Sequence, residues 1–154
     1  MPQTANTGTH SSSARAYYYR DIRVGMRESR DYVITPEVYE RFLAAFQDYS
    51  PLHVDEDFAK SRGFDGRVMH GCLLTGFLSH FVGMHFPGRF SMLLTLDMRF
   101  SNPSYLGDSI SLTAVVGQKA DERQIVVLDA TLSNNTRKCL AARGRLQVMI
   151  QEAP

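Results

Sequence analysis

The chain has 154 residues, a length that suits one domain built around a single core. Hydrophobic residues make up 44% and charged residues 21% of the chain, an ordinary globular composition that excludes wholesale disorder and fibrous repeats. The formal net charge is +1 with no cluster of like charges, which argues against nucleic acid or an anionic membrane surface as a partner.

The first 16 residues predict a flexible polar tail, and residues 17–154 predict one domain. The tail is rich in Ser and Thr and lacks the apolar stretch of a secretory signal, and no apolar run reaches the roughly 20 residues of a membrane-spanning helix. The two cysteines lie far apart and outside any CxxC pair. We therefore expect a cytoplasmic protein with free thiols. Residues 17–24 and 30–34 are aromatic and β-branched stretches, typical of weak strands or an extended lead-in.

A helix is expected next. Thr35 and Pro36 predict its start, because a capping hydroxyl precedes a proline at the first helical position. Apolar side chains at helical spacing extend it to about Gln47. Pro51 disfavours helical backbone at the residue before it, so we expect residues 48–53 to form a non-helical connector.

Two further helices follow in the pattern. Residues 55–62 predict a short helix with acids in its first turn and bases in its last. Residues 70–86 leave almost no polar face and predict a long helix that is buried all round. Small side chains recur along it at steps of four, three and four, namely Cys72, Gly76, Ser79 and Gly83. Such a stripe would let a sheet or a ligand approach closely.

The remainder of the chain predicts four strands, because apolar and polar residues alternate with period two. The clearest stretches are residues 94–100 and 110–116, followed by 125–132 and 138–150, with residues 134–136 as a hairpin turn. One apolar helix followed by an antiparallel meander predicts an α+β domain whose sheet wraps around that helix.

The densest group of reactive side chains lies between Asp48 and Asp55. A carboxylate at Asp48 and an imidazole at His53, on one proline-containing turn, are able to bind the same water, as general acid–base catalysis of hydration requires. For an isolated Asp/His pair, the simpler interpretation is that Asp48 caps the backbone and His53 is a packed, satisfied histidine.

The segment Asp48-Tyr49-Ser50-Pro51-Leu52-His53-Val54-Asp55 resembles the signature D-x-N-P-[LIV]-H-x-D of the MaoC-like dehydratases. That family contains the (R)-specific enoyl-CoA hydratases. The likeness continues through His70-Gly71-Cys72-Leu73-Leu74 and covers roughly residues 42–116. The chain departs from the family at Gln47 and Ser50, where the family has glycine and asparagine, and this bears on the substrate more than on the fold.

The resemblance implies a single hot-dog fold, an antiparallel sheet wrapped around a long buried central helix, and an enzyme that hydrates trans-2-enoyl thioesters or dehydrates 3-hydroxyacyl thioesters. Asp48 and His53 would activate the water that attacks C3, and which of them is the base stays open. The Gly71 N–H, at a helix start, would stabilise the negative charge that develops on the thioester oxygen. Ser79 would support the pair, and mere packing roles for Gly71 and Ser79 stay open as well.

Ser50, His70 and Cys72 are the candidate substrate-binding residues. For His70 a structural role, fixing the loop before Gly71 through a ring hydrogen bond, is expected rather than proton transfer. The expected partner is an acyl-CoA or acyl-carrier-protein thioester, with no metal and no cofactor beyond that carrier, and the resemblance implies a homodimer. Two alternatives are a hot-dog acyl thioesterase and a non-catalytic acyl-binding or partner subunit. Residues 70–86 contain no Asp or Glu, which favours the hydratase over the thioesterase.

Overall fold

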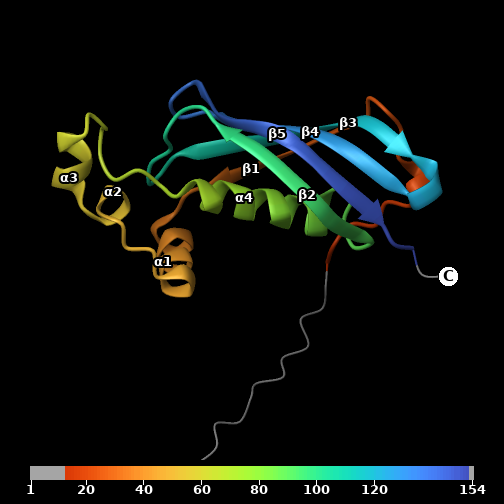
Figure 1. Cartoon of the computed structure of the whole chain (residues 1–154), viewed down its shortest axis with the longest axis horizontal. Coiled ribbons are helices and arrows are strands. Elements are labelled where there is room, and N and C mark those ends of the chain that lie inside the picture. Colours follow the sequence, from red (N-terminus) through yellow and green to blue (C-terminus); the bar gives the residue numbers. More distant parts are fainter. Residues whose placement is uncertain (1–12, 153–154) are drawn as a thin grey trace, which may run out of the picture.

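Five antiparallel strands form one sheet, and a helical segment lies across one face of it (Figure 1). The computed structural model describes residues 13–152. The strands are β1 (Arg27–Val33), β2 (Ser91–Phe100), β3 (Ser109–Ala120), β4 (Ile125–Asn134) and β5 (Cys139–Ile150). The helices are α1 (Pro36–Phe46), α2 (Pro51–Val54), α3 (Glu56–Ser61) and α4 (Gly71–His80), with 3-10 turns η1 (Tyr19–Asp21) and η3 (Asp121–Arg123) and a π-helical segment η2 (Phe81–His85). The α+β class is confirmed.

The strand order is β1-β3-β4-β5-β2, so β1 and β2 lie at the two edges of the sheet. β3, β4 and β5 are consecutive antiparallel neighbours, as a meander requires. β2 departs from that pattern, because it pairs with β5 rather than with β3, which follows it in the chain. The prediction of a simple meander is wrong at this point, since period-two alternation identifies the faces of a strand but not its neighbours.

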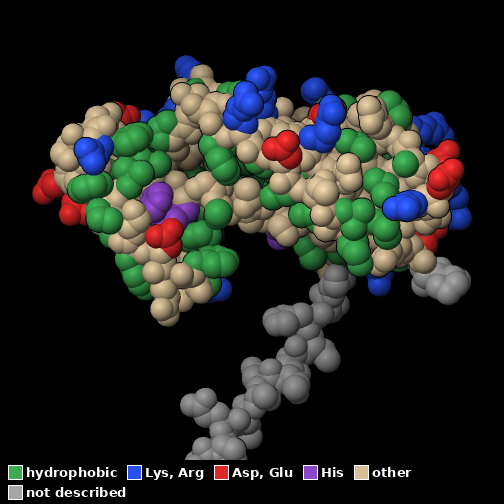
Figure 2. Space-filling view, viewed as in Figure 1, with side chains coloured by type: hydrophobic (Ala, Val, Ile, Leu, Met, Phe, Trp, Pro, Cys, Tyr) green, Lys and Arg blue, Asp and Glu red, His purple; other side chains and the backbone are tan. Residues whose placement is uncertain are grey.

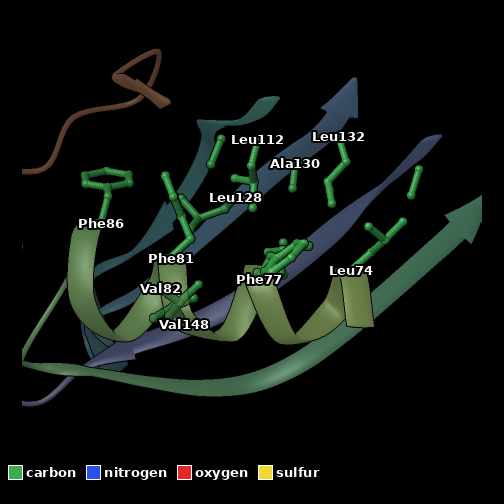
Figure 3. Packing of buried hydrophobic residues seen from close by; sticks show 14 of the residues in the cluster. Leu74, Phe77, Phe81, Val82, Phe86, Leu112, Leu128, Ala130, Leu132 and Val148 are labelled. Carbon is green, nitrogen blue, oxygen red and sulfur yellow. The ribbon is translucent and has the colours of Figure 1, made fainter. Parts of the chain in front are cut away.

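The core lies between the sheet and the α4–η2 segment. Along β3 the inward-facing residues Ile110, Leu112, Ala114 and Val116 are fully buried, and their neighbours are not. In Figure 3 the side chains of Phe77 and Phe81 point from the helical segment toward Leu112, Leu128 and Leu132 on the strands. The alternation read from the sequence therefore corresponds to one buried face of the sheet.

α4 is buried on one side only. Leu74, Phe77 and Leu78 pack under the sheet, whereas the small residues Cys72, Gly76 and Ser79 are exposed. The prediction of a helix buried all round is therefore wrong, and so is the expected approach of the sheet to the small-residue stripe. The physical reason is that the sheet packs where large side chains bury the most apolar area, which is the opposite side of the helix.

α1, α2 and α3 extend from one end of the sheet (Figure 1). The Thr35 hydroxyl accepts from the backbone N–H of Val38 at 3.2 Å, which confirms the predicted cap, and α1 ends where Gln47 adopts a left-handed backbone, φ 53°. The prediction of a non-helical connector over residues 48–53 is wrong from Pro51 onward. Proline also suits the first position of a helix, and α2 begins there. α3 confirms the short helix, and Asp55 caps it.

The chain enters the domain earlier than residue 17. Arg15 donates its N–H to the carbonyl of Met84 at 3.1 Å, and Ala16 forms a β-bridge with Gly88. Residues 1–12 of the predicted tail lie outside the described residues. Within residues 13–152, no helix has the length and apolar character needed to cross a membrane.

Candidate active site

Asp48 lies in the short connector between α1 and α2. The left-handed backbone of Gln47 ends α1 and turns the chain. The Asp48 carboxylate then accepts the Ser50 N–H at 3.2 Å, in the short-range pattern of an aspartate turn. Its side chain is 55% exposed, so one carboxylate oxygen is held by the turn while the group stays accessible to water or ligand.

His53 lies on α2 and is held through its ring and its backbone carbonyl. Its Nδ1 lies 2.6 Å from the carbonyl oxygen of Val68, and because a carbonyl only accepts, Nδ1 carries the proton. Nε2 of a neutral ring then carries a lone pair, as a base requires. The Tyr39 hydroxyl donates to the His53 carbonyl at 2.9 Å, and burial raises the pKa of Tyr39, which keeps that donor protonated. The Val68 N–H in turn donates to the carbonyl of Leu52 at 3.1 Å.

His70 precedes α4 and lies behind His53. The two imidazole rings stack with centroids 3.7 Å apart and planes inclined by 29°. Nε2 of His70 donates to the Asp48 carbonyl at 3.0 Å and lies 3.4 Å from the carboxylate oxygen Oδ2. Only 5% of His70 is exposed, and its role in binding substrate stays a prediction. Burial, and then the nearby His53, lower the pKa of His70, so the ring is neutral near pH 7.

The three side chains form one compact group. A carboxylate oxygen of Asp48 and one ring nitrogen each of His53 and His70 lie within 4.8 Å of one another. A water that makes two hydrogen bonds of about 2.8 Å at a tetrahedral angle spans about 4.6 Å between its partners. The upper bound of 4.8 Å on these separations is compatible with a water held between Asp48 and His53. Figure 2 shows histidine side chains grouped with an acidic one near α1.

The same three groups have the ligand types of a zinc site, but the geometry suits one poorly. Nδ1 of His53 and Nε2 of His70 are each bonded to a backbone carbonyl. That the site uses no metal stays a prediction.

A pocket of about 320 Å³ opens next to His53. Its lining is mainly apolar and comprises His53, Phe64, Val68, Met69, Gly71, Leu74, Phe100, Ser101, Asn102, Pro103 and Ser104. Gly71 is the first residue of α4, where backbone N–H groups have no partner within the helix. The Phe100 ring lies against it, since a Cβ at residue 71 would meet Phe100 Cζ at 2.9 Å. His53 and a helix start thus line the same pocket.

A buried network anchors the loop between α3 and α4. Asp108 is 2% exposed, and its Oδ2 accepts from the Tyr105 N–H at 2.8 Å and from Asn134 Nδ2 at 2.6 Å. Arg137 Nε also reaches Oδ2, at 3.2 Å, while its Nη1 binds Asp65 in the loop at 2.6 Å. The loop that holds His53 is therefore tied to the strand ends.

The structure brings Asp48, His53 and Gly71 together and leaves Ser79 apart from them. Ser79 lies on the exposed side of α4, eight residues and roughly 12 Å of helix beyond Gly71. Cys72 is exposed on the same helix, and Ser50 contributes its N–H to Asp48. The functional roles of Ser79, Cys72 and Ser50 stay predictions.

Sequence reasoning missed three contributors to this site. Val68 acts through its carbonyl and Tyr39 through a bond to a carbonyl, and backbone contacts of this kind leave no pattern in side-chain type. Phe100 ends the strand β2, and its position against Gly71 depends on the tertiary packing.

Comparison with known proteins identifies the family of the chain. A family model described as "MaoC like domain" matches residues 21–137. The chain is 30% identical over 115 residues to the (R)-specific enoyl-CoA hydratase of Rhodospirillum rubrum, covering 75% of this chain and 80% of that protein. It is 28% identical over 135 residues to a mitochondrial 3-hydroxyacyl-[acyl-carrier-protein] dehydratase of Arabidopsis thaliana, covering 86% of this chain and 75% of that one.

A solved structure has the same fold. The (R)-hydratase from A. caviae involved in PHA biosynthesis superposes with a TM-score of 0.78 at 25% identity, covering 85% of this chain and 98% of that one. The hot-dog fold expected from the sequence is therefore confirmed.

Proposed function

The chain belongs to the family of MaoC-like domains, and on this premise we propose that it is a hydro-lyase. It adds water to trans-2-enoyl thioesters with (R) stereochemistry, or removes water from 3-hydroxyacyl thioesters in the reverse direction. The supporting relatives are named for these two reactions. The observation that carries the proposal is His53: its Nδ1–H is fixed on Val68, which leaves Nε2 as a base at a pocket shared with Gly71.

The reaction needs one water and two proton transfers. The water held between Asp48 and His53 gives its oxygen to C3, and one of its protons passes to the pair, with Nε2 of His53 as the acceptor. The electrons of the C2–C3 double bond move onto the thioester carbonyl as an enolate. A proton from the pair then reaches C2 on the same face, so one water is consumed and the pair returns to its starting state.

The enolate oxygen needs stabilisation while it carries charge. The Gly71 N–H lies at the positive end of α4 and lines the same pocket as His53. In other enzymes one such donor contributes about 10²- to 10³-fold in rate. A glycine also lets the thioester carbonyl come close to the backbone, because there is no side chain in the way.

The substrate is an acyl thioester with coenzyme A or an acyl carrier protein as the carrier. One relative is named for a CoA thioester and another for an acyl-carrier-protein thioester, so the family accommodates both carriers. The absence of a further cofactor and the cytoplasmic location stay predictions.

A homodimer is also proposed, formed through β2. This strand is an edge of the sheet, and an uncovered edge offers unpaired backbone groups to a second strand. Leu96 and Phe100 on β2 face the helix side of the sheet and are 38% and 49% exposed, which is unusual for large apolar residues so placed. Light scattering should give twice the chain mass, and Leu96→Lys should lower it. A wild-type monomer at working concentration would reject the dimer.

The activity is tested by mixing the purified protein with a short trans-2-enoyl-CoA and following the loss of enoyl absorbance. Free thiol is measured in the same samples, because hydrolysis releases coenzyme A and hydration does not. Loss of enoyl absorbance without thiol release supports the hydratase. Thiol release at a comparable rate would instead identify a thioesterase, and inactivity with both CoA and carrier-protein thioesters would leave a non-catalytic subunit.

A further inference from the structure

His70 contacts both members of the proposed catalytic pair. Its Nε2 bonds the Asp48 carbonyl at 3.0 Å and lies 3.4 Å from the Asp48 carboxylate. One face of its ring stacks on His53 at 3.7 Å. Phe42 and Tyr39 of α1 pack against the ring, with centroids 4.9 and 5.9 Å away. The side chain is therefore enclosed by the site and by α1.

The second ring nitrogen of His70 is unusual. Because Nε2 donates to a carbonyl, Nδ1 of the neutral ring is bare, and within the described residues it is buried without a hydrogen-bond partner. A buried polar atom without a partner lowers stability, and phenylalanine or leucine would fill this space without that cost. Packing alone does not explain a histidine here.

The neutral state of His70 fits a role beside a base. The ionisable groups facing it are Asp48 on the connector, His53 on α2 and Tyr39 on α1. Protonation would put a proton on the unpartnered Nδ1 and a charge 3.7 Å from the His53 ring, which would oppose proton uptake by His53. A neutral ring supports His53 without this repulsion.

We infer that His70 is a positioning residue for the proposed hydration. Its N–H fixes the Asp48 connector, and its ring fixes the plane of His53, so that the two groups stay at the separation that one water spans. The inference rests on the proposed function, since positioning is meaningful only if the pair acts on a water.

Two variants separate the two contacts. His70→Phe keeps a flat ring against His53 and removes the donor to Asp48, whereas His70→Gln keeps an N–H near the position of Nε2 and removes the ring. We expect His70→Phe to lower kcat about 10- to 100-fold, with KM within about twofold, because misplacement of a reacting group costs rate and the lining of the pocket does not include His70. His70→Gln should recover part of that loss. His85→Gln is the matched control, because His85 is also buried with an unpartnered ring nitrogen but packs against Phe81 and Glu28.

A double-mutant cycle with Asp48→Asn tests whether His70 acts through Asp48. If it does, His70→Phe should cost less than about twofold in the Asp48→Asn background, because the partner it positions is already disabled. Equal losses of kcat in both backgrounds, or a rise in KM with kcat unchanged, would overturn the inference and leave His70 as a packing residue. Circular dichroism and thermal unfolding of each variant establish that it is folded.

A measurement without substrate keeps the inference apart from the proposed function. Long-range ¹⁵N–¹H spectra of the wild-type protein at pH 7 should show His70 neutral, with its proton on Nε2. A charged His70, or a proton on Nδ1, would overturn the positioning geometry whether or not the protein is active. The expected tautomer in a protein that fails to hydrate any enoyl thioester would instead reject the function and, with it, the positioning role.

Discussion

The Asp108→Asn substitution should destabilise the protein strongly, although it changes only one atom type. The carboxylate of Asp108 is 2% exposed, and its Oδ2 accepts from Tyr105, Asn134 and Arg137. Its Oδ1 accepts from Arg137 Nε as well, at 3.3 Å. An amide has one acceptor oxygen and two donor hydrogens. Asparagine can keep the bonds to Tyr105 and Asn134 only by turning its NH₂ group toward Arg137, which places donors against a cation.

The expected cost is about 2–3 kcal/mol, because one charge-assisted bond is lost and a buried donor is left facing the guanidinium. For a chain of this length, a change of 1 kcal/mol moves Tm by about 2–4 °C, so the fall should be about 4–12 °C. Arg137 also binds Asp65 in the loop between α3 and α4, so that loop should loosen and kcat should fall.

The assay is thermal unfolding by circular dichroism, with Asp129→Asn as the control. Asp129 bonds Arg145 at 2.8 Å, but the two side chains are 48% and 60% exposed, so the same change there should cost at most about 1 kcal/mol. Equal shifts of Tm in the two variants would refute the argument that burial makes the Asp108 network important.

Three further outcomes follow from the geometry. Gly71→Ala should lower kcat about 10-fold or more, because its Cβ would meet the Phe100 ring at 2.9 Å and displace groups at the proposed oxyanion position. Phe100→Leu in the same chain should restore part of the rate. An unchanged rate in Gly71→Ala would count against Gly71 as the donor. Burial lowers the pKa of both His70 and His85 below the ordinary 6.5, so the unfolded chain binds protons first as pH falls below that value. The free energy of unfolding, followed through Tm, should therefore decrease as the pH is lowered from about 7.5 to about 5.5. His85→Gln should reduce this decrease. A higher Tm at about pH 5.5 than at about pH 7.5 would contradict the predicted direction. Thr35→Ala should lower the free energy of unfolding in urea by about 1 kcal/mol through loss of the α1 cap, whereas Thr35→Ser should leave it nearly unchanged. Equal losses in the two variants would contradict a capping role for the Thr35 hydroxyl.

Local chemistry made several elements predictable from the sequence. The cap at Thr35 depends on neighbouring residues, and the strands depend on a period that one buried face imposes. The order of the strands was not predictable in this way, because the pairing of β2 with β5 is a long-range choice. The exposed stripe on α4 was misread for a related reason, since a small side chain is compatible with either a close contact or open solvent.

The side chains of the candidate site could be predicted from the sequence, but the backbone contacts that orient them could not. Asp48 and His53 were identified from one continuous segment, and the structure places their polar atoms within 4.8 Å. The tautomer of His53 is set by the Val68 carbonyl, which no residue type encodes. For His70 the sequence predicts substrate binding or a ring hydrogen bond that fixes the loop before Gly71, and the structure shows which group the ring bonds, the Asp48 carbonyl.

The most direct test of the account is the rate of enoyl-CoA hydration by Asp48→Asn and His53→Gln, with chiral analysis of the wild-type product. Asp55→Asn serves as the control, because Asp55 lies in the same segment but caps α3, and asparagine caps as well. The account predicts that each site variant loses about 10²- to 10⁴-fold in kcat, that Asp55→Asn stays within about twofold, and that the product is the (R)-3-hydroxyacyl thioester. Full activity in either site variant, or an (S) product, would contradict it.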